Sequence, residues 1–178
     1  MSAPTPTLGE PQDEFSLPPV PGAELSDLVA AAEFDDVHFF LSEAISEGAI
    51  DAPTPAEKAT FTLLPYEHPD QAIDDQAFEA IEDAGYAQAT LADLLCLAIA
   101  RPDLQRDFDI VALGTLRTRR INKDGPGDTV WDQSDLDKSI CQWATGLSNL
   151  KERRTLVPVE LFLDKVLRNP TLILVRKV

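Results

Sequence analysis

Residues 89–114 constrain the fold most strongly, because they combine a well-marked helix with a continuous apolar strand. Apolar residues recur there at i, i+3, i+4, i+7 and i+8, a spacing that keeps one face of a helix apolar. Thr90 is the predicted N-cap, Asp93 three residues later forms a variant of the capping box, and Pro102 ends the helix. Apart from Asp109, residues 108–113 form a short apolar run without alternation, which favours a strand buried on both faces. The core should therefore be built on this stretch.

Patterns on either side of this stretch predict the other elements. Before it we expect helices from residue 23 and over residues 36–47, a strand over residues 59–66 and a helix over residues 74–84. After it we expect a hairpin turn over residues 123–128, a helix beginning at Pro158 and a terminal strand over residues 171–178.

Residues 136–150 have two interpretations. Ile140, Trp143 and Leu147 follow a spacing of three and four residues, which predicts a helix with Ser134 and Asp137 near its start. Gly146 disfavours a helix, and two strands are the alternative. We adopt the helix for the prediction of the fold.

Together these elements predict an α+β fold with a small, mostly antiparallel sheet of three to five strands covered by about six helices. Residues 1–22 are Pro-rich and lack any apolar period, so we expect a disordered arm there. Residues 23–178 then form a single domain, with an acidic helical part over residues 23–108 and a basic, sheet-containing part over residues 109–178.

The net charge of -16 is unevenly distributed along the 178 residues. Residues 1–110 hold 23 Asp and Glu against 3 Lys and Arg, a net of -20, whereas residues 111–178 hold 8 against 12, a net of +4. Such an acidic half repels nucleic acid and anionic membranes, so we expect no direct binding to either. The first residues lack the positive charge and apolar segment of a secretory signal, and no apolar run is long enough for a membrane span. We therefore expect a cytoplasmic protein.

An A-T-L-x-x-L-L helix is followed by a P-D-L-Q-R-x-F turn and an I-V-A-L-G strand within residues 89–114. In these motifs the chain resembles a group of small bacterial proteins of uncharacterised function, and the resemblance covers about residues 59–116. The end of the chain, LILVRK, matches more loosely, and residues 132–151 depart from the pattern. The resemblance implies a shared fold and supplies no activity, cofactor or site residue.

Arginines form the most informative polar cluster. One segment carries Arg117, Arg119 and Arg120. A second segment carries Lys151, Arg153 and Arg154. If the fold joins the segments, the patch is a candidate site for a phosphate or an acidic protein segment. The alternative is internal use, in which the arginines neutralise acidic helices of this chain or of a second copy.

No motif in the chain predicts catalysis, a cofactor or a metal site. His68 lies between carboxylates but has no second ligand nearby, and Cys96 and Cys141 lack metal-ligand spacing. The leading hypothesis is a protein-interaction or regulatory module without catalytic activity, with a homo-oligomer possible. One alternative is an acidic nucleic-acid mimic that inhibits a DNA- or RNA-binding protein. Another is an enzyme with a site assembled around His68 or a cysteine.

One aromatic side chain departs from the helical pattern of its segment. Phe39 lies off the apolar stripe of the predicted helix over residues 36–47. It marks either a partner surface or a wider buried face, and the pattern favours neither.

Overall fold

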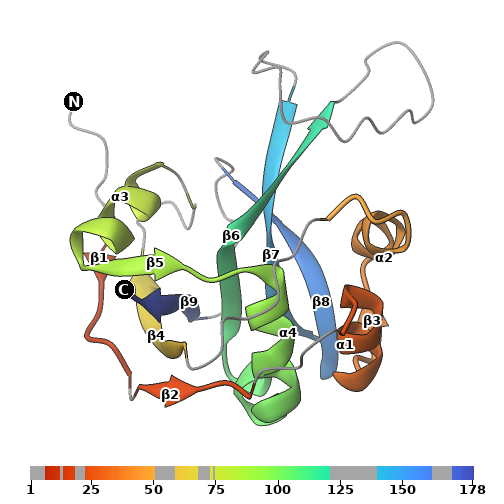
Figure 1. Cartoon of the computed structure of the whole chain (residues 1–178), viewed down its shortest axis with the longest axis horizontal. Coiled ribbons are helices and arrows are strands. Elements are labelled where there is room, and N and C mark those ends of the chain that lie inside the picture. Colours follow the sequence, from red (N-terminus) through yellow and green to blue (C-terminus); the bar gives the residue numbers. More distant parts are fainter. Residues whose placement is uncertain are drawn as a thin grey trace.

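The computed structural model describes residues 7–12, 14–18, 23–50, 59–67, 73, 75–120, 140–161 and 170–178; for residues 75, 116–120, 140 and 141 it describes the backbone alone. Within these residues, nine strands form one mixed sheet, accompanied by four α-helices and one 3-10 helix (Figure 1). No helix of the described residues is long and apolar enough to cross a membrane.

The strands are β1 (Thr7–Leu8), β2 (Phe15–Ser16), β3 (Asp36–Val37), β4 (Thr60–Glu67), β5 (Tyr86–Gln88), β6 (Asp109–Arg120), β7 (Ile140–Leu150), β8 (Arg153–Glu160) and β9 (Thr171–Lys177). The helices are α1 (Leu25–Ala31), α2 (Phe39–Ser46), α3 (Asp75–Asp83), α4 (Leu91–Ala100) and the 3-10 helix η1 (Pro102–Arg106).

The sheet is larger than the sequence predicts. Its strand order is β1-β4-β9-β6-β7-β8-β3, with β2 also paired to β4 and β5 to β9. The pairs β6/β9 and β3/β8 are parallel, and the others are antiparallel. The prediction of three to five strands under about six helices is therefore wrong. Four of the strands have only two or three residues, too short to leave an alternating pattern in the sequence.

The segment predicted as a helix over residues 136–150 is a strand wherever it is described. β7 is buried on both faces from Trp143 to Ser148, so it shows no polar alternation and its apolar spacing imitates a helix. Gly146 fits the strand, because a Cβ atom there would lie 2.7 Å from Cγ2 of Val159 on β8. Within residues 140–150 the chain is therefore a strand and not a helix, and it is one strand where the alternative expected two.

The turn between β7 and β8 has no glycine to mark it. Leu150 pairs with Arg153, which leaves Lys151 and Glu152 as a two-residue turn with φ values of 55° and 65°. Positive φ at both positions is the geometry of a tight hairpin turn, for which Asn-Gly is the usual signal. Because that signal is absent, the hairpin is not predictable from the local sequence.

The helix predicted to begin at Pro158 is also wrong, because Pro158 lies inside β8. The carbonyl oxygens of Arg154 and Leu156 accept hydrogen bonds from Asp35 and His38, at 3.0 and 2.9 Å. Residues 154 and 156 of β8 thus turn their backbone groups toward β3 and away from β7. Pro158, two residues further, faces the same side, at a point where β3 has already ended. Its missing N–H therefore removes no bond to β7. Residues 162–169 of the predicted helix lie outside the described residues.

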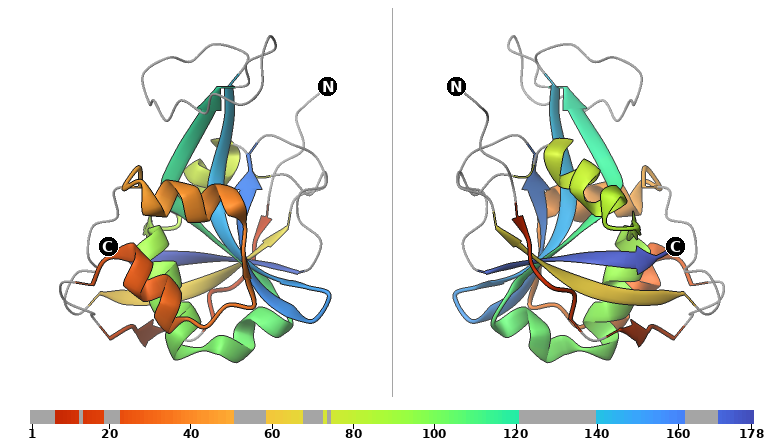
Figure 2. Two further views of the ribbon diagram at one scale, coloured as in Figure 1. Left: turned by 90° about the vertical axis from the view of Figure 1, so that its right-hand side faces the viewer. Right: turned by 90° about the vertical axis from the view of Figure 1, so that its left-hand side faces the viewer.

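Helices cover both faces of the sheet. α1, α2 and α4 pack on one face, over a core that includes Leu94, Ile110 and Ala112. α3 packs on the other, with Val111 and Leu113 among the residues beneath it (Figure 2). Successive residues of β6 therefore enter opposite cores, which confirms the strand buried on both faces.

The junction between α4 and β6 is held by a close backbone approach. Thr90 and Asp93 form the predicted capping box at the start of α4. The N–H of Gly114 donates to the carbonyl of Ala89 at 2.8 Å, and a Cβ atom at Gly114 would lie 2.7 Å from that oxygen. The N–H of Leu91, which has no partner within its helix, donates to Oγ1 of Thr115 at 2.9 Å.

Part of the segment expected to be a disordered arm lies along β4. Besides the pairing of β1 and β2, the N–H groups of Gly9 and Gln12 donate to the carbonyls of Pro65 and Leu63, at 2.8 and 3.0 Å. The Phe15 ring stacks on that of Phe61, with centroids 6.4 Å apart. These bonds connect residues about fifty positions apart, so a local pattern does not reveal them.

Two side chains attach this N-terminal segment further. Leu17 is buried in the core beneath α4. Glu14 accepts a hydrogen bond of 2.5 Å from the Lys177 ammonium on β9, and this contact raises the pKa of Lys177 above its usual value. The segment therefore covers the outer edge of β4.

Candidate functional site

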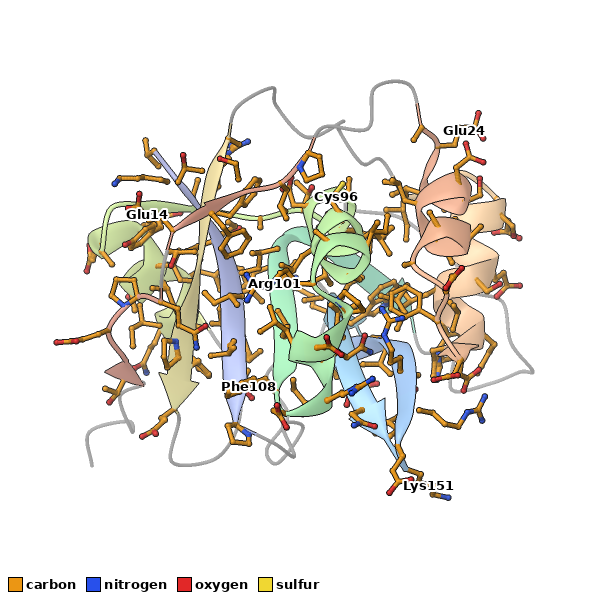
Figure 3. The ribbon with its side chains drawn as sticks, turned by 90° about the horizontal axis from the view of Figure 1, so that it is seen from below. Glu14, Glu24, Cys96, Arg101, Phe108 and Lys151 are labelled. Atoms are coloured by element: carbon orange, nitrogen blue, oxygen red, sulfur yellow. The ribbon has the colours of Figure 1, made fainter. Side chains whose placement is uncertain are left out.

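The two groups of basic residues predicted as one patch lie at opposite ends of β7. Arg117 pairs with Trp143 near one end, whereas Arg153 pairs with Leu150 at the other. The seven steps along the strand from Trp143 to Leu150 span about 23 Å at roughly 3.3 Å per residue. Lys151 lies in the turn beyond Leu150 (Figure 3). The structure thus does not bring the groups together, and the side chains of Arg117, Arg119 and Arg120 lie outside the described residues.

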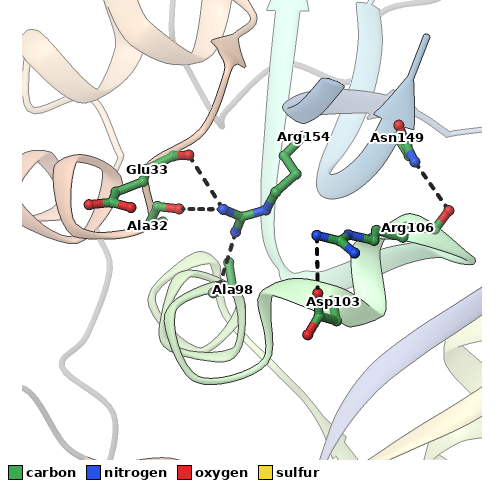
Figure 4. Close-up of polar contacts among 7 residues, drawn as sticks. All are labelled: Ala32, Glu33, Ala98, Asp103, Arg106, Asn149 and Arg154. Atoms are coloured by element: carbon green, nitrogen blue, oxygen red, sulfur yellow. Dashed lines mark hydrogen bonds and ion pairs between the residues drawn. The ribbon is translucent and has the colours of Figure 1, made fainter. Parts of the chain in front are cut away.

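Arg154 binds the C-terminal ends of two helices (Figure 4). Its guanidinium donates to the carbonyls of Ala32, Glu33 and Ala98, at 3.0, 3.4 and 3.1 Å. The carbonyl of Ala98 would normally accept from the N–H four residues later, but that residue is Pro102, which has none. Arg154 supplies the missing donor, and its charge is favourable at the negative end of a helix.

Further contacts hold both arginines of β8 against the chain before α2. The Arg154 guanidinium lies 5.5 Å from the centroid of the Phe34 ring, and its backbone N–H donates to Oδ2 of Asp35 at 2.7 Å. Nη2 of Arg153 donates to the carbonyl of Asp35, also at 2.7 Å. The guanidinium groups of both residues thus bind backbone carbonyls of this chain. The neutralisation of acidic helices and ligand binding by any of the five predicted arginines both stay predictions.

A buried polar network connects η1 to β7 and β8, which sequence reasoning missed. Nε2 of Gln105 donates to the carbonyls of Ser148 and Thr155, at 2.7 and 2.9 Å. The Ser148 hydroxyl donates to Oδ1 of Asp109 at 2.7 Å. Nearby, Nδ2 of Asn149 donates to the Arg106 carbonyl at 3.2 Å (Figure 4). The network contains amides, a hydroxyl and one carboxylate, and its bonds fix η1 against the hairpin.

The enzyme alternative finds no support at Cys96. This thiol is buried, and its pKa is raised to about 11 by desolvation and by the negative charge of Asp93. It is therefore protonated at neutral pH and a poor nucleophile. His68 and the side chain of Cys141 lie outside the described residues, where the alternative stays a prediction. Among the described residues no group of three His, Cys, Asp or Glu is placed to bind a metal.

Among the described residues, the most exposed large aromatic side chain lies at the start of α2. Phe39 has 63% of its surface exposed. In the part of the chain that the structure describes, Val178 is the other large apolar side chain that is exposed. The Phe39 ring lies 3.9 Å from that of Phe40 and 4.9 Å from that of His38, between centroids. Nδ1 of His38 accepts a hydrogen bond of 3.4 Å from the Phe40 N–H and so caps the helix. The three rings form one continuous aromatic surface.

The segment that carries these rings is acidic, and the basic residues Arg153 and Arg154 of β8 contact it at Asp35. Residues 23–50 contain no Lys or Arg. Their acidic side chains are all exposed: Glu24, Asp27, Glu33, Asp35, Asp36, Glu43 and Glu47. We call these carboxylates, with the rings of residues 38–40, the acidic aromatic surface.

Comparison with protein-family models, with curated proteins and with solved structures gave no match. The shared fold implied by the short motifs therefore stays a prediction. What the molecule does has to be inferred from its own geometry, and the acidic aromatic surface is the feature that the fold itself does not explain.

Exposed carboxylates also occur far from this surface. Glu79, Glu82 and Asp83 lie on α3, which packs on the opposite face of the sheet from α2 (Figure 2). A nucleic-acid mimic needs its carboxylates gathered on one face like the phosphates of a strand. The distribution among the described residues does not favour that alternative, which stays a prediction.

Proposed function

We propose that this protein is a cytoplasmic interaction module without catalytic activity, which binds a protein partner through its acidic aromatic surface. The observation that carries the proposal is the 63% exposure of Phe39. Aromatic side chains are enriched at the centres of protein interfaces, where they supply a large part of the binding energy. A partner that covers Phe39 buries apolar surface that the isolated protein leaves in water.

The backbone beneath the surface supports this role because it is held in place before any partner binds. β3 pairs with β8, and the N–H groups of Asp35 and His38 on either side of it both donate to β8 carbonyls. His38 then caps α2 directly before Phe39. A site on fixed elements loses little conformational freedom on binding, which favours affinity.

The charge of the surface determines the kind of partner. Residues 23–50 carry seven exposed carboxylates, whereas two arginines of β8, Arg153 and Arg154, contact the same segment. The excess of negative charge favours a partner with a basic rim around an apolar pocket. Attraction of this kind accelerates association and weakens as salt is added. Binding should therefore fall as the ionic strength rises.

Affinity capture from a native lysate tests the proposal when the full chain is compared with two variants. Phe39→Ala removes the exposed ring, and Val178→Ala removes the other exposed apolar side chain, which lies at the far end of β9. We expect a specific set of proteins that Phe39→Ala loses, that Val178→Ala retains, and that dissociates with added salt. If wild type and Phe39→Ala capture the same proteins in the same amounts, the proposal is wrong.

A further inference from the structure

We infer that the partner presents an arginine whose guanidinium lies on the ring of Phe39 and pairs with the carboxylate of Glu43. This inference rests on the proposed function, because it concerns the same surface. It specifies the chemistry that the surface recognises.

The first step is the relation between the two side chains. Phe39 and Glu43 lie four residues apart on α2, and residues at this spacing are neighbours on one helix face, with Cβ atoms about 5–6 Å apart. Both side chains are exposed. No Lys or Arg of the described residues forms an ion pair with Glu43. A planar cation on the ring would therefore have a carboxylate within reach.

The second step is the choice of cation. The face of an aromatic ring carries negative potential and attracts a cation, and a carboxylate on the same helix face, such as that of Glu43, strengthens that attraction. A guanidinium can stack flat on the ring while its N–H groups point outward toward a carboxylate. The ammonium of lysine is a strongly hydrated point charge without a flat face. The geometry therefore favours arginine over lysine at equal charge.

The third step is an equivalent arrangement inside the same chain. Arg154 lies over the Phe34 ring, 5.5 Å from its centroid, while its N–H groups donate to the carbonyls of Ala32 and Ala98. The internal arginine combines ring contact with oxygen acceptors, as the inferred partner arginine does. Phe34 is already covered by this cation, whereas Phe39, five residues later, is exposed.

Two peptides of equal charge test the inference on the full chain. The probes are acetylated and amidated (Gly-Arg)3 and (Gly-Lys)3, titrated at low salt while the backbone amide signals are followed by NMR. We expect both peptides to shift signals of α2, and the arginine peptide to bind about 2- to 5-fold more tightly, as one exposed ring contact provides. Phe39→Ala should abolish this preference and leave the lysine affinity nearly unchanged.

Two substitutions that each remove one negative charge test whether Glu43 is the carboxylate that pairs with the arginine. Glu43→Gln should lower the affinity for the arginine peptide about 2-fold or more, whereas Glu82→Gln on α3 should have a smaller effect. Amide spectra of each variant establish that the fold is intact.

Equal affinity for the two peptides, a preference that survives Phe39→Ala, or no shift at α2 with either peptide would each overturn the inference. The capture experiment with Phe39→Ala is judged separately. If Phe39→Ala loses the captured partner but the two peptides bind equally well, the proposed interaction surface stands and the inferred arginine is rejected.

Discussion

Arg154 has a structural role that is larger than a surface arginine usually has. Its guanidinium is shared by the ends of α1 and α4, and one of the carbonyls it binds lacks a helical donor because of Pro102. From the sequence, Pro102 predicts the helix end, but the donor that satisfies the Ala98 carbonyl comes from 56 residues away. The partners of Arg154 are backbone atoms that no sequence pattern identifies. For this reason the sequence predicts Arg154 as part of a ligand site.

Replacing Arg154 should destabilise the fold. We expect Arg154→Met to lower the free energy of unfolding by about 2–4 kcal/mol, because hydrogen bonds from a charged group are lost and helix carbonyls are left without partners. Arg153→Met is the matched control, since Arg153 makes one exposed bond to a carbonyl, and it should cost less than about 1 kcal/mol. Urea unfolding followed by circular dichroism measures both. Equal losses for the two variants would contradict the role assigned to Arg154.

Cys96 should react slowly in the folded protein. Its pKa of about 11 lies two units above the ordinary value of 9.0, so near pH 8 its thiolate fraction is about 100-fold lower than in the unfolded chain. We expect alkylation by iodoacetamide at pH 8 to be at least about 100-fold slower in the folded state than in urea. Mass mapping of the peptide that contains Cys96 measures the rate without interference from Cys141. Rapid modification of the folded protein would be inconsistent with this burial.

The same raised pKa fixes the sign of a pH effect on stability. The folded state keeps the Cys96 thiol neutral up to about pH 11, whereas the unfolded chain releases the proton near pH 9. The contribution of this group is therefore fully present below pH 9 and is lost as the pH rises toward 11. The free energy of unfolding of Cys96→Ala should therefore fall less between pH 9 and pH 11 than that of the wild-type protein, as denaturation at both pH values would measure.

At the scale of elements, the junction between α4 and β6 depends on a hydroxyl from the strand. Thr115→Val keeps the shape of the side chain but removes the acceptor of the Leu91 N–H, leaving a buried donor unsatisfied. We expect a loss of about 1–3 kcal/mol in the free energy of unfolding. Ser46→Ala, which removes an exposed bond to the Glu43 carbonyl, should cost less than about 0.5 kcal/mol. Chemical denaturation of both variants at one pH provides the comparison.

Elements with local signals were predicted well, and elements that depend on distant partners were not. The capping box of α4 and the buried strand β6 follow from neighbouring residues, so the sequence identified both. The segment of β7 was predicted as a helix because a strand buried on both faces lacks alternation, and the last residues of β8 were predicted as the start of a helix because Pro158 resembles a first helical residue. β3 has two residues and forms only because β8 offers its edge, so no local pattern reveals it.

For the candidate site, the sequence identified one residue and left its meaning open. Phe39 departs from the apolar stripe of its helix, and the structure excludes the wider buried face by showing the ring exposed, whereas the partner surface stays a proposal. The predicted basic patch failed to assemble because β7 separates its two halves.

At the scale of the whole molecule, the N-terminal segment should be part of the folded unit. Deleting residues 1–17 removes buried Leu17 and the Phe15 ring, and it exposes the outer edge of β4. We expect this deletion to lower the free energy of unfolding by about 2–4 kcal/mol and to promote self-association through the open edge.

Deleting residues 1–6 alone leaves β1 and β2 in the chain and is the matched control for this truncation. Thermal unfolding, together with light scattering at several protein concentrations, compares the two forms. A protein without residues 1–17 that is as stable and as monodisperse as the control would show that the segment is dispensable.

The interaction surface is tested most directly by placing a photo-crosslinker at its centre in living cells. We would introduce p-benzoylphenylalanine at position 39, and at position 82 on α3 as the control, and irradiate the cells. We expect position 39 to give a crosslinked adduct of defined mass that is suppressed by excess wild-type protein and is absent with the crosslinker at position 82. No adduct at position 39, or the same adducts from both positions, would contradict a partner-binding surface centred on Phe39.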